Sequence, residues 1–252
     1  MSNCITSPAF KCLIVASLLP TSCDKMDNTN EPENTQIFQR LTQDMPINDW
    51  TAIERVFSKT NAIDYSEVWE EGPSPNYQRA EVRVLWDTAG LWILAKLQDV
   101  DIHNTAKKTN DPTWQMGDVF EIFLVTPGSE RYLEFHVTPG NVHLQIVWPN
   151  FQTITELRAK GLRAFDYMLE EPLLSSWVDV KQQNNQWTIL AKVSANAITD
   201  NGPLKAGMEL KTSFSRYDRF QDSDQIIFSS TSPHKKINYH IQSDWKDFEL
   251  LP

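Results

Sequence analysis

The chain has 252 residues, of which 40% are hydrophobic and 22% charged, and its formal net charge at pH 7 is −10. These proportions are typical of a globular protein, and the length allows one substantial core. An acidic surface repels phosphate backbones, so we expect no nucleic-acid partner.

The N-terminal segment predicts export from the cytoplasm. Lys11 precedes a short apolar run over residues 12–19, and small residues precede Cys23. This arrangement resembles a bacterial lipoprotein signal over residues 1–22, with Cys23 as the lipidated residue. We therefore expect an extracytoplasmic protein held to the lipid bilayer through acylated Cys23. Secretion or a periplasmic location is the alternative.

Residues 23–37 contain almost nothing to bury, so they predict a flexible tether ahead of a domain over residues 38–252. All three cysteines lie within the first 23 residues. We therefore expect neither a disulfide nor a thiolate metal cluster in the domain. Its sequence also contains no stretch approaching the ~20 apolar residues of a membrane helix.

Alternating apolar and polar residues predict a series of short strands. The candidate strands cover residues 80–86, 91–97, 118–125, 132–138, 142–148, 177–181, 186–193 and 208–215. Residues 155–161 predict a short helix or loop, and residues 194–198 a helical turn. Turns rich in Pro, Gly and Asn divide the strands. The sequence therefore predicts an all-β fold, a single-domain antiparallel β-sandwich of jelly-roll or immunoglobulin-like type with short helical turns.

Two of these strands carry polar side chains in informative positions. Residues 118–125 are apolar on both faces apart from Glu121, as expected for a central strand that is covered on both sides. A carboxylate at that position requires a polar partner. In residues 132–138 we expect Tyr132, Glu134 and His136 to face outward, because they alternate with apolar residues.

Nine tryptophans are more than we expect one core of this size to hold. Trp86, Trp92 and Trp187 lie within strand patterns and predict packing in the core or on the sheet. Trp50 and Trp245, near the two ends of the domain, are expected to pack against the core.

Three other tryptophans lie at less regular positions. Trp114 is in a loop without strand periodicity, Trp148 precedes a Pro-Asn pair, and Trp177 follows Leu-Ser-Ser. Indole suits stacking on the apolar face of a sugar ring, because its N–H can still reach a polar partner. These residues therefore favour a carbohydrate site.

Several motifs resemble those of carbohydrate-binding module family 9. They are LWILAKLQDVDI at 91–102, the following tryptophan loop, GDVFEIFL at 117–124 and YLEFHVTPGN at 132–141. FSRY at 214–217 and the closing residues 245–250 are similar to the tail of such domains. The resemblance spans about residues 50–251, and it implies a β-sandwich that binds saccharides without catalysis.

The resemblance also implies site residues. In that family two tryptophans enclose a terminal sugar, and carboxylate, amide and arginine side chains bind its hydroxyl groups. Trp114 corresponds to the first tryptophan; we choose Trp177 for the second, with Trp148 as the alternative. Glu121 matches the family pattern by position. Further side chains able to form paired hydrogen bonds are Arg131, Glu134, Gln145 and Arg216.

Members of the family often bind structural calcium, for which Asp99, Asp101 and Asp118 are the candidate ligands. The loop lacks the ligand-dense spacing and the turn glycine of an EF-hand. A structural calcium ion is therefore an option implied by the resemblance, and we expect no required cofactor.

Other functions have weaker support in the sequence. A related group of sandwiches binds b-type haem, for which Met116 with His136 or His143 is conceivable. The five histidines lack zinc-motif spacing, and no nucleophile elbow or phosphate-binding glycine loop is present. Glu121 and Glu134 alone do not establish a hydrolase. We expect a non-catalytic protein; the alternative is a sandwich that serves as an interaction or structural domain without sugar binding.

Overall fold

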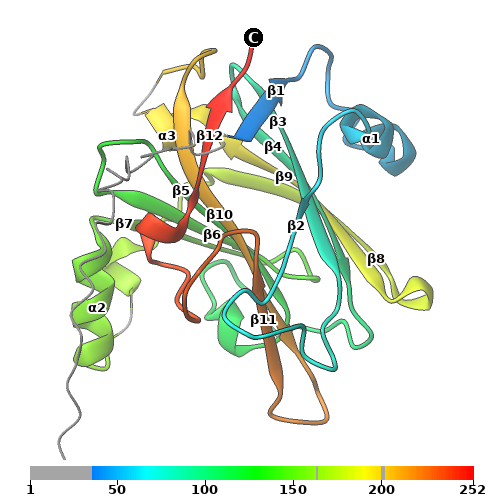
Figure 1. Ribbon diagram of the computed structural model, residues 1–252, viewed down its shortest axis with the longest axis vertical. Helices are drawn as coiled ribbons and strands as arrows, with labels where there is room; N and C mark the ends of the chain where they lie inside the picture. Colours follow the sequence, from blue (N-terminus) through cyan, green and yellow to red (C-terminus); the bar gives the residue numbers. More distant parts are fainter. Residues whose placement is uncertain (1–35, 163, 200–201) are drawn as a thin grey trace, which may run out of the picture. The chain divides into compact units, whose positions relative to one another are not determined.

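A computed structural model describes residues 36–162, 164–199 and 202–252, which form a mostly β unit (Figure 1). The strands of this part are β1 Gln36–Arg40, β2 Ile63–Asp64, β3 Ala80–Asp87, β4 Gly90–Gln98, β5 Val119–Val125, β6 Tyr132–Val137, β7 His143–Trp148, β8 Leu174–Lys181, β9 Gln186–Ser194, β10 Glu209–Arg219, β11 Ile226–Ser230 and β12 Lys246–Leu250. The α-helices are α1 Trp50–Phe57, α2 Phe151–Ala159 and α3 Ala195–Thr199, and the 3₁₀ turns are η1 Thr113–Gln115, η2 Phe165–Tyr167, η3 Gln182–Asn184 and η4 Gln242–Asp244.

Ten of the described strands form one hydrogen-bonded path, in the order β7-β6-β5-β10-β12-β1-β3-β4-β9-β8. We call β7-β6-β5-β10-β12 the β5 arm and β3-β4-β9-β8 the β4 arm. Strand β1 joins them, because its first half pairs in parallel with β12 and its second half pairs in parallel with β3. All other pairings between named strands are antiparallel.

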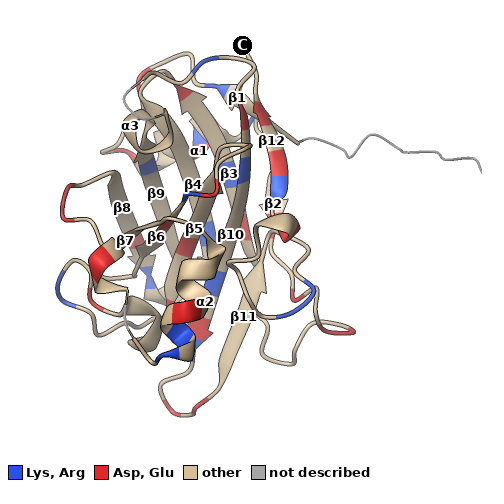
Figure 2. Ribbon diagram, turned by 90° about the vertical axis from the view of Figure 1, so that its left-hand side faces the viewer, with Lys and Arg blue, Asp and Glu red and all other residues tan. Residues whose placement is uncertain are grey.

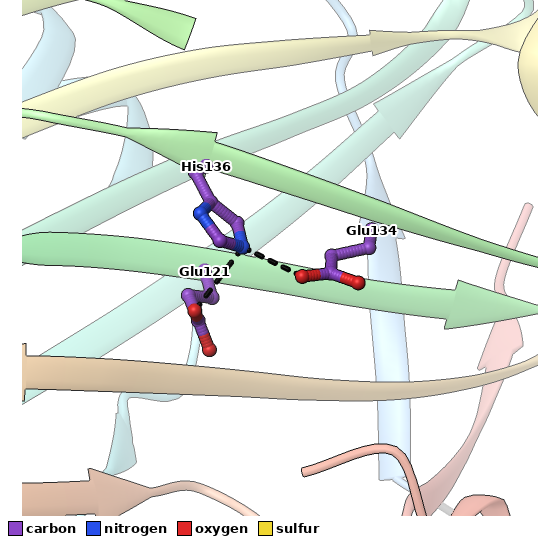
Figure 3. Close-up of side chains that lie close together, drawn as sticks. All are labelled: Glu121, Glu134 and His136. Carbon is purple, nitrogen blue, oxygen red and sulfur yellow. Dashed lines mark hydrogen bonds and ion pairs between the residues drawn. The ribbon is translucent and has the colours of Figure 1, made fainter. Parts of the chain in front are cut away.

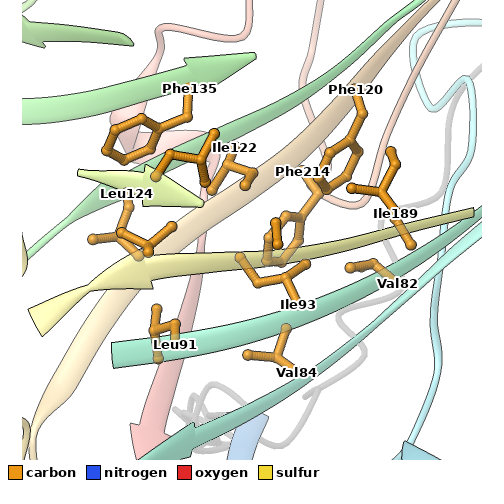
Figure 4. Close-up of a cluster of buried hydrophobic side chains, with 14 of the residues drawn as sticks. Val82, Val84, Leu91, Ile93, Phe120, Ile122, Leu124, Phe135, Ile189 and Phe214 are labelled. Atoms are coloured by element: carbon orange, nitrogen blue, oxygen red, sulfur yellow. The ribbon is translucent and has the colours of Figure 1, made fainter. Parts of the chain in front are cut away.

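The main core lies between the two arms (Figure 4). Each strand sends every second side chain toward it. The β5 arm contributes Phe120, Ile122, Leu124, Phe135 and Phe214, and the β4 arm contributes Val82, Val84, Leu91, Ile93 and Ile189. The rings of Phe120 and Phe214 stack with centroids 6.2 Å apart. Apolar contact across the interior therefore holds the arms together.

Helices cover the outer faces of both arms. On the β4 arm, Ile53 and Phe57 of α1 pack against Leu85, Trp92 and Leu190. On the β5 arm, α2 lies over the face of the sheet (Figure 2), and α2 and the segment 231–245 contribute residues to a second apolar cluster. That cluster contains Phe123, Val125, Tyr132, Leu144, Ile146, Trp148, Ile154, Tyr239 and Trp245. The β5 arm is thus buried on both sides.

Local sequence explains where the two longer helices begin. Asp49 precedes α1 and its side chain accepts a hydrogen bond from the Ala52 N–H, at 3.1 Å. Asn150 precedes α2 and accepts in the same way from the Thr153 N–H, at 2.9 Å. Short polar side chains at these positions satisfy backbone donors that a helix leaves unpaired.

The prediction of a mostly β fold is confirmed, and each predicted strand corresponds to an observed one. The continuous path through β1 makes the sheet nearly barrel-like, so the jelly-roll or immunoglobulin-like type remains a prediction. Strand β1 begins at Gln36, inside the tether expected to reach residue 37. The predicted signal peptide and most of the tether, residues 1–35, lie outside the described residues.

Among the described residues, no helix has both the length and the apolar character needed to cross a bilayer.

One expected outward face is in fact buried. Tyr132, Glu134 and His136 do point away from the main core, as their alternation predicts, but all six residues of β6 are buried. The reason is the second apolar cluster, which covers this face. Alternation within β6 predicts one exposed face, but it carries no information on the distant segments of the chain that cover that face.

A buried ion pair lies at one end of the main core. The Nη2 atom of Arg216 donates to Asp99 Oδ2 at 3.2 Å and lies 3.0 Å from Asp218 Oδ2. An oxygen of Asp118 lies within 4.8 Å of an oxygen of Asp99 and of Asp218. The Asp118 carboxylate also accepts the backbone N–H groups of His103 and Arg219. Burial and the neighbouring Asp99 raise the pKa of Asp118 to about 9. Arg216 is thus the internal counter-ion of an acidic cluster.

Replacing Arg216 by methionine should destabilise the protein by about 3 to 5 kcal/mol, because it leaves buried carboxylates without their cation. Arg79→Met is a matched control. The Arg79–Asp64 pair has the same 3.2 Å separation, but the Arg79 side chain is 72% exposed whereas that of Arg216 is 1% exposed. The control should cost less than about 1 kcal/mol. Chemical denaturation measures both, and equal losses would contradict the assignment.

Acid should destabilise the segment that covers the β5 arm. Burial lowers the pKa of His234 to about 4, against the opposing attraction of Asp244. The unfolded state, with an ordinary histidine, binds more protons between pH 6.5 and 4, so stability falls as the pH drops through that range. Acidification from pH 7 to pH 5 should cost about 2 kcal/mol through this residue.

His234→Gln tests this expectation, because glutamine cannot titrate and still offers Ser213 a hydrogen-bonding partner. Urea unfolding of both proteins at pH 7 and pH 5 should show a smaller acid-induced loss in the variant. An unchanged pH dependence would mean that His234 is protonated equally in the folded and unfolded states.

Candidate functional site

A cavity of about 420 Å³ opens on the outer face of the β5 arm. Strands β5, β6, β7 and β10 supply its floor, and α2 and the segment 231–245 supply walls. The lining residues include Trp114, Glu121, Glu134, His136, Ile146, Trp148, Ile154, Leu157, Arg158, Leu162, Tyr217, Ile237, Asn238, Tyr239 and His240. Polar groups therefore converge at the base of a largely apolar hollow, the usual composition of a small-molecule site.

Strand register brings the polar groups of the floor together. Glu121 in β5 is directly opposite His136 in β6, and Glu134 is two residues from His136 on the same face. Their neighbours Phe120, Ile122 and Phe135 point into the main core instead. Figure 3 shows the three polar side chains converging. The cluster is a product of cross-strand pairing.

His136 is the centre of this cluster. Its Nε2 atom lies 2.8 Å from Glu134 Oε1 and 3.1 Å from Glu121 Oε1 (Figure 3). Its Nδ1 atom lies 2.8 Å from the hydroxyl oxygen of Thr113. The second oxygen of Glu121, Oε2, is buried and has no hydrogen-bond partner among the described residues. The ring is therefore fixed, while one carboxylate oxygen is unsatisfied.

The surroundings give the carboxyl groups of Glu121 and Glu134 different pKa values. Burial raises the pKa of Glu121 to about 8, although the charge of His136 opposes the shift. Burial also acts on Glu134, but His240, His136 and the indole N–H of Trp148 outweigh it and hold the pKa of Glu134 at about 2. Glu134 is the ionised member of the pair near neutral pH, and Glu121 is able to donate a hydrogen bond.

A second group of side chains holds Glu134 in place. The Nε1–H of Trp148 donates to Glu134 Oε2. The Nδ1 atom of His240 lies 3.8 Å from the same oxygen and 2.9 Å from the hydroxyl oxygen of Tyr132. Trp148 is buried, and its ring stacks on Tyr132 with centroids 6.2 Å apart. Its role in the fold is thus to pack and to orient a carboxylate.

Trp114 stands in a firmly held loop at the cavity wall. Both Nε and Nη2 of Arg219 donate to its carbonyl oxygen, at 3.0 and 2.7 Å. Asn104 donates to the carbonyl of Thr113 on one side of the loop and of Asp118 on the other. The indole itself is half-buried and meets His136 edge-on, with ring centroids 6.0 Å apart.

Gly117 allows the loop to close. Its φ is +144°, and a Cβ at this position would lie 2.4 Å from the carbonyl oxygen of His103. Only glycine tolerates such an approach of two backbones. The glycine of the GDVFEIFL motif therefore allows the end of the tryptophan loop to lie directly against the backbone of His103 and Asn104.

The structure does not bring Trp177 to this cavity. Trp177 lies on β8 in the β4 arm, where its ring stacks on Trp92 with centroids 6.2 Å apart. It lines a separate, shallower hollow together with Trp50 and Asn141. The tryptophan that shares a cavity with Trp114 is the alternative choice, Trp148.

Other predicted site residues also lie elsewhere. Arg216 is buried in its ion pair and does not line the cavity, so its expected contact with a sugar is not available. Arg131 is exposed ahead of β6 and is outside the lining. The side-chain oxygen of Gln145 accepts the backbone N–H groups of Leu173 and Leu174. Of the hydrogen-bonding candidates, Glu121 and Glu134 reach the cavity.

The acidic residues proposed for calcium do not form a suitable site. Asp99 and Asp118 lie close together with Asp218, but the guanidinium of Arg216 already provides the cation. Asp101 instead accepts hydrogen bonds from the backbone and side chain of Gln221. Calcium needs six to eight oxygen ligands, and these oxygens are largely engaged. This donor set does not fit a structural calcium ion.

The haem alternative finds no support in the side-chain arrangement. Met116 does not line the cavity that contains His136, so the expected pair of axial ligands does not meet there. The Nε2 atom of His143 lies 2.5 Å from the Ser176 hydroxyl oxygen.

Several cavity residues were missed in the sequence. Arg158, Tyr217, Asn238 and His240 line the cavity but were not predicted as site residues, and three different segments contribute them. Thr113, which contacts His136 from outside the lining, was missed as well. The strand alternation could have indicated Tyr217, which lies on the same face of the β5 arm as Glu121. The other three lining residues depend on how α2 and the segment 231–245 fold over the sheet.

Comparisons with known proteins identify the family and the fold of the chain. The profile of the family described as "Carbohydrate family 9 binding domain-like" matches residues 49–212. No curated protein matches the chain. Among solved structures, a candidate carbohydrate-binding protein from Bacteroides uniformis is similar, with a TM-score of 0.65 and 13% identity over 85% of this chain and 97% of that one.

Family 9 carbohydrate-binding modules from Caldicellulosiruptor kristjanssonii are similar as well. The complex with cellotriose has a TM-score of 0.56 and 12% identity, and covers 86% of this chain and 93% of that one. The complex with glucose has the same TM-score and 11% identity, and covers 86% and 94%. At these identities the likeness shows the fold. The profile match spans more than half of the sequence, and the chain therefore belongs to the carbohydrate family 9 binding domain-like family.

Proposed function

We propose that this protein binds a saccharide in the cavity on the outer face of the β5 arm, without catalysing its conversion. The observation that carries the proposal is the half-buried indole of Trp114 at the wall of a cavity whose base holds Glu121 and Glu134. An aromatic face orients a sugar ring, and carboxyl groups select its hydroxyls. The volume of about 420 Å³ is in the usual range of ligand pockets.

The residues that line the cavity would make different kinds of contact with a bound sugar. The backbone of Trp114 is fixed by Arg219, so this residue loses little conformational entropy when a sugar binds. Glu134 accepts hydrogen bonds from hydroxyl groups, and Glu121 donates one when protonated. Arg158 and Asn238 at the opposite wall add further donors. The solved complexes of related modules with cellotriose and glucose support a saccharide as the class of ligand.

We further propose that the fold is the β-sandwich of this family and that the protein acts as a binding module. The carboxyl groups of Glu121 and Glu134 meet on a single histidine, whose Nε2 lies within 3.1 Å of an oxygen of each. Glycosidases instead place their two carboxyl groups about 5 Å or more apart, on either side of the scissile bond.

Trp114→Ala should abolish or weaken saccharide binding at least tenfold, because it removes the ring on which the sugar stacks. Trp177→Ala is the matched control, since this tryptophan is also half-buried but lines a different hollow. Calorimetric titration with glucose and cello-oligosaccharides, preceded by a glycan array to find other ligands, measures both variants.

The two variants also separate the alternatives. Loss of binding in Trp177→Ala with retention in Trp114→Ala would move the site to the hollow on the β4 arm. Absence of binding to any glycan would favour the interaction or structural domain and overturn the proposal.

We also propose that the protein is a lipoprotein acylated at Cys23 and exposed outside the cytoplasm. The support is the sequence pattern of residues 1–23, with an apolar run and small residues ahead of the cysteine. The predicted tether would then separate the binding domain from the bilayer.

Cys23→Ser should abolish incorporation of labelled palmitate and release the protein from the membrane fraction, because the acyl chains are the expected anchor. Cys12→Ser, which removes a cysteine inside the apolar run, should change neither. Continued membrane association and labelling of Cys23→Ser would contradict the lipid anchor.

A further inference from the structure

The cluster at the base of the cavity leaves one buried carboxyl oxygen without a partner among the described residues. A single atom, His136 Nε2, faces an oxygen of Glu134 at 2.8 Å and an oxygen of Glu121 at 3.1 Å. One N–H cannot point at two carboxyl oxygens at once with good geometry. Glu121 Oε2 is the oxygen without a partner in this part of the structure, although Glu121 is 2% exposed. A bound cation would provide this oxygen, the second carboxyl group and the ring nitrogen with a shared partner.

The distances are close to those of a metal coordination shell. One ligand atom from each of Glu121, Glu134 and His136 lies within 4.8 Å of the other two. Zinc binds nitrogen and oxygen at roughly 2.0–2.2 Å, which separates the ligand atoms of a tetrahedron by about 3.3 to 3.6 Å. Small side-chain movements therefore suffice to widen the present separations of 2.8 and 3.1 Å.

Two of the three side chains have the outer partners typical of metal ligands. Thr113 Oγ1 contacts the far ring nitrogen of His136, at 2.8 Å, and this contact orients the ring with Nε2 toward the carboxyl groups. The Nε1–H of Trp148 donates to Glu134 Oε2 and leaves Oε1 directed at the histidine. The third, Glu121, lines the cavity and has one oxygen without a hydrogen-bond partner in the described part of the chain.

We propose that Glu121, Glu134 and His136 bind one divalent transition-metal ion, of which zinc is the best match, with an open coordination position facing the cavity. Imidazole nitrogen with two carboxylates suits zinc and its neighbours, whereas calcium requires more oxygen ligands. Three protein ligands leave a fourth position for water or for an oxygen of a bound molecule. The proposal does not rest on sugar binding, since the ligands are complete without it.

The decisive experiment is a metal titration of the purified full-length protein. Cys4, Cys12 and Cys23 are replaced by serine in every sample, because thiolates bind zinc themselves. Calorimetry with Zn²⁺ and visible absorption with Co²⁺ should both show one ion per chain, and Zn²⁺ should raise the unfolding temperature.

Variants then assign the ion to this cluster. Glu121→Gln, which preserves shape, should weaken Zn²⁺ binding at least tenfold and remove the rise in unfolding temperature. Thr113→Val, which removes only the hydroxyl that holds His136, should weaken it by about tenfold or more. Glu156→Gln on the exposed side of α2 is the matched control and should bind as the parent does.

Two results would overturn the proposal. One is absence of saturable 1:1 binding up to millimolar Zn²⁺ in the cysteine-free protein. The other is unchanged affinity in a folded Glu121→Gln variant, which would place the ion elsewhere. Because saccharide binding is measured separately and in the presence of a chelator, either result leaves the proposed saccharide site to be judged on its own evidence.

Discussion

The register between β5 and β6 is the constraint on which the site depends. Glu121 lies opposite His136, and the residues between the polar ones point into the main core. A slip by one residue would turn the carboxyl groups toward the phenylalanines and bring apolar side chains to the cavity floor. The two apolar clusters on either side of the β5 arm prevent that slip, because each face has its own set of buried side chains to keep.

Burial gives the polar residues of this arm their chemistry. The same carboxyl groups on an open strand would have ordinary pKa values and flexible hydrogen bonds. The helix α2 and the segment 231–245 cover the strand. Under this cover the pKa of Glu121 is raised and that of Glu134 is lowered, and His136 is fixed between them. Saccharide recognition and metal binding, as proposed here, both use groups that the covering segments have removed from water.

The strands and the general position of the site follow from local sequence, but their surroundings do not. Alternation places the β-strands and identifies Glu121 as unusual, because period-two patterns depend only on neighbouring residues. The helix α1 was not predicted, although Asp49 ahead of it is a recognisable cap. The helix α2 begins four residues before the short helix or loop predicted for residues 155–161, because Asn150 caps it at Phe151.

The choice of the tryptophan that shares a cavity with Trp114 could not be made from local sequence. Trp148 and Trp177 each stand at the edge of a strand predicted from the sequence, and the neighbouring residues do not indicate which arm of the sheet either tryptophan joins. That choice is made by strand order, which places β7 beside β6 and β8 beside β9. Likewise Arg216 reads as an exposed basic residue, although Asp99 and Asp218 enclose it from both arms of the fold.

The position of β1 has a mechanical consequence. This strand pairs in parallel with β12 at one end and with β3 at the other, and it directly follows the N-terminal segment. A pull applied at Gln36 runs along the strand axis, so it loads the hydrogen bonds on both sides together in shear. Detaching β1 therefore requires breaking several hydrogen bonds at once. This resistance preserves the connection of β12 with β3 through β1 when the domain is pulled from its N-terminal side.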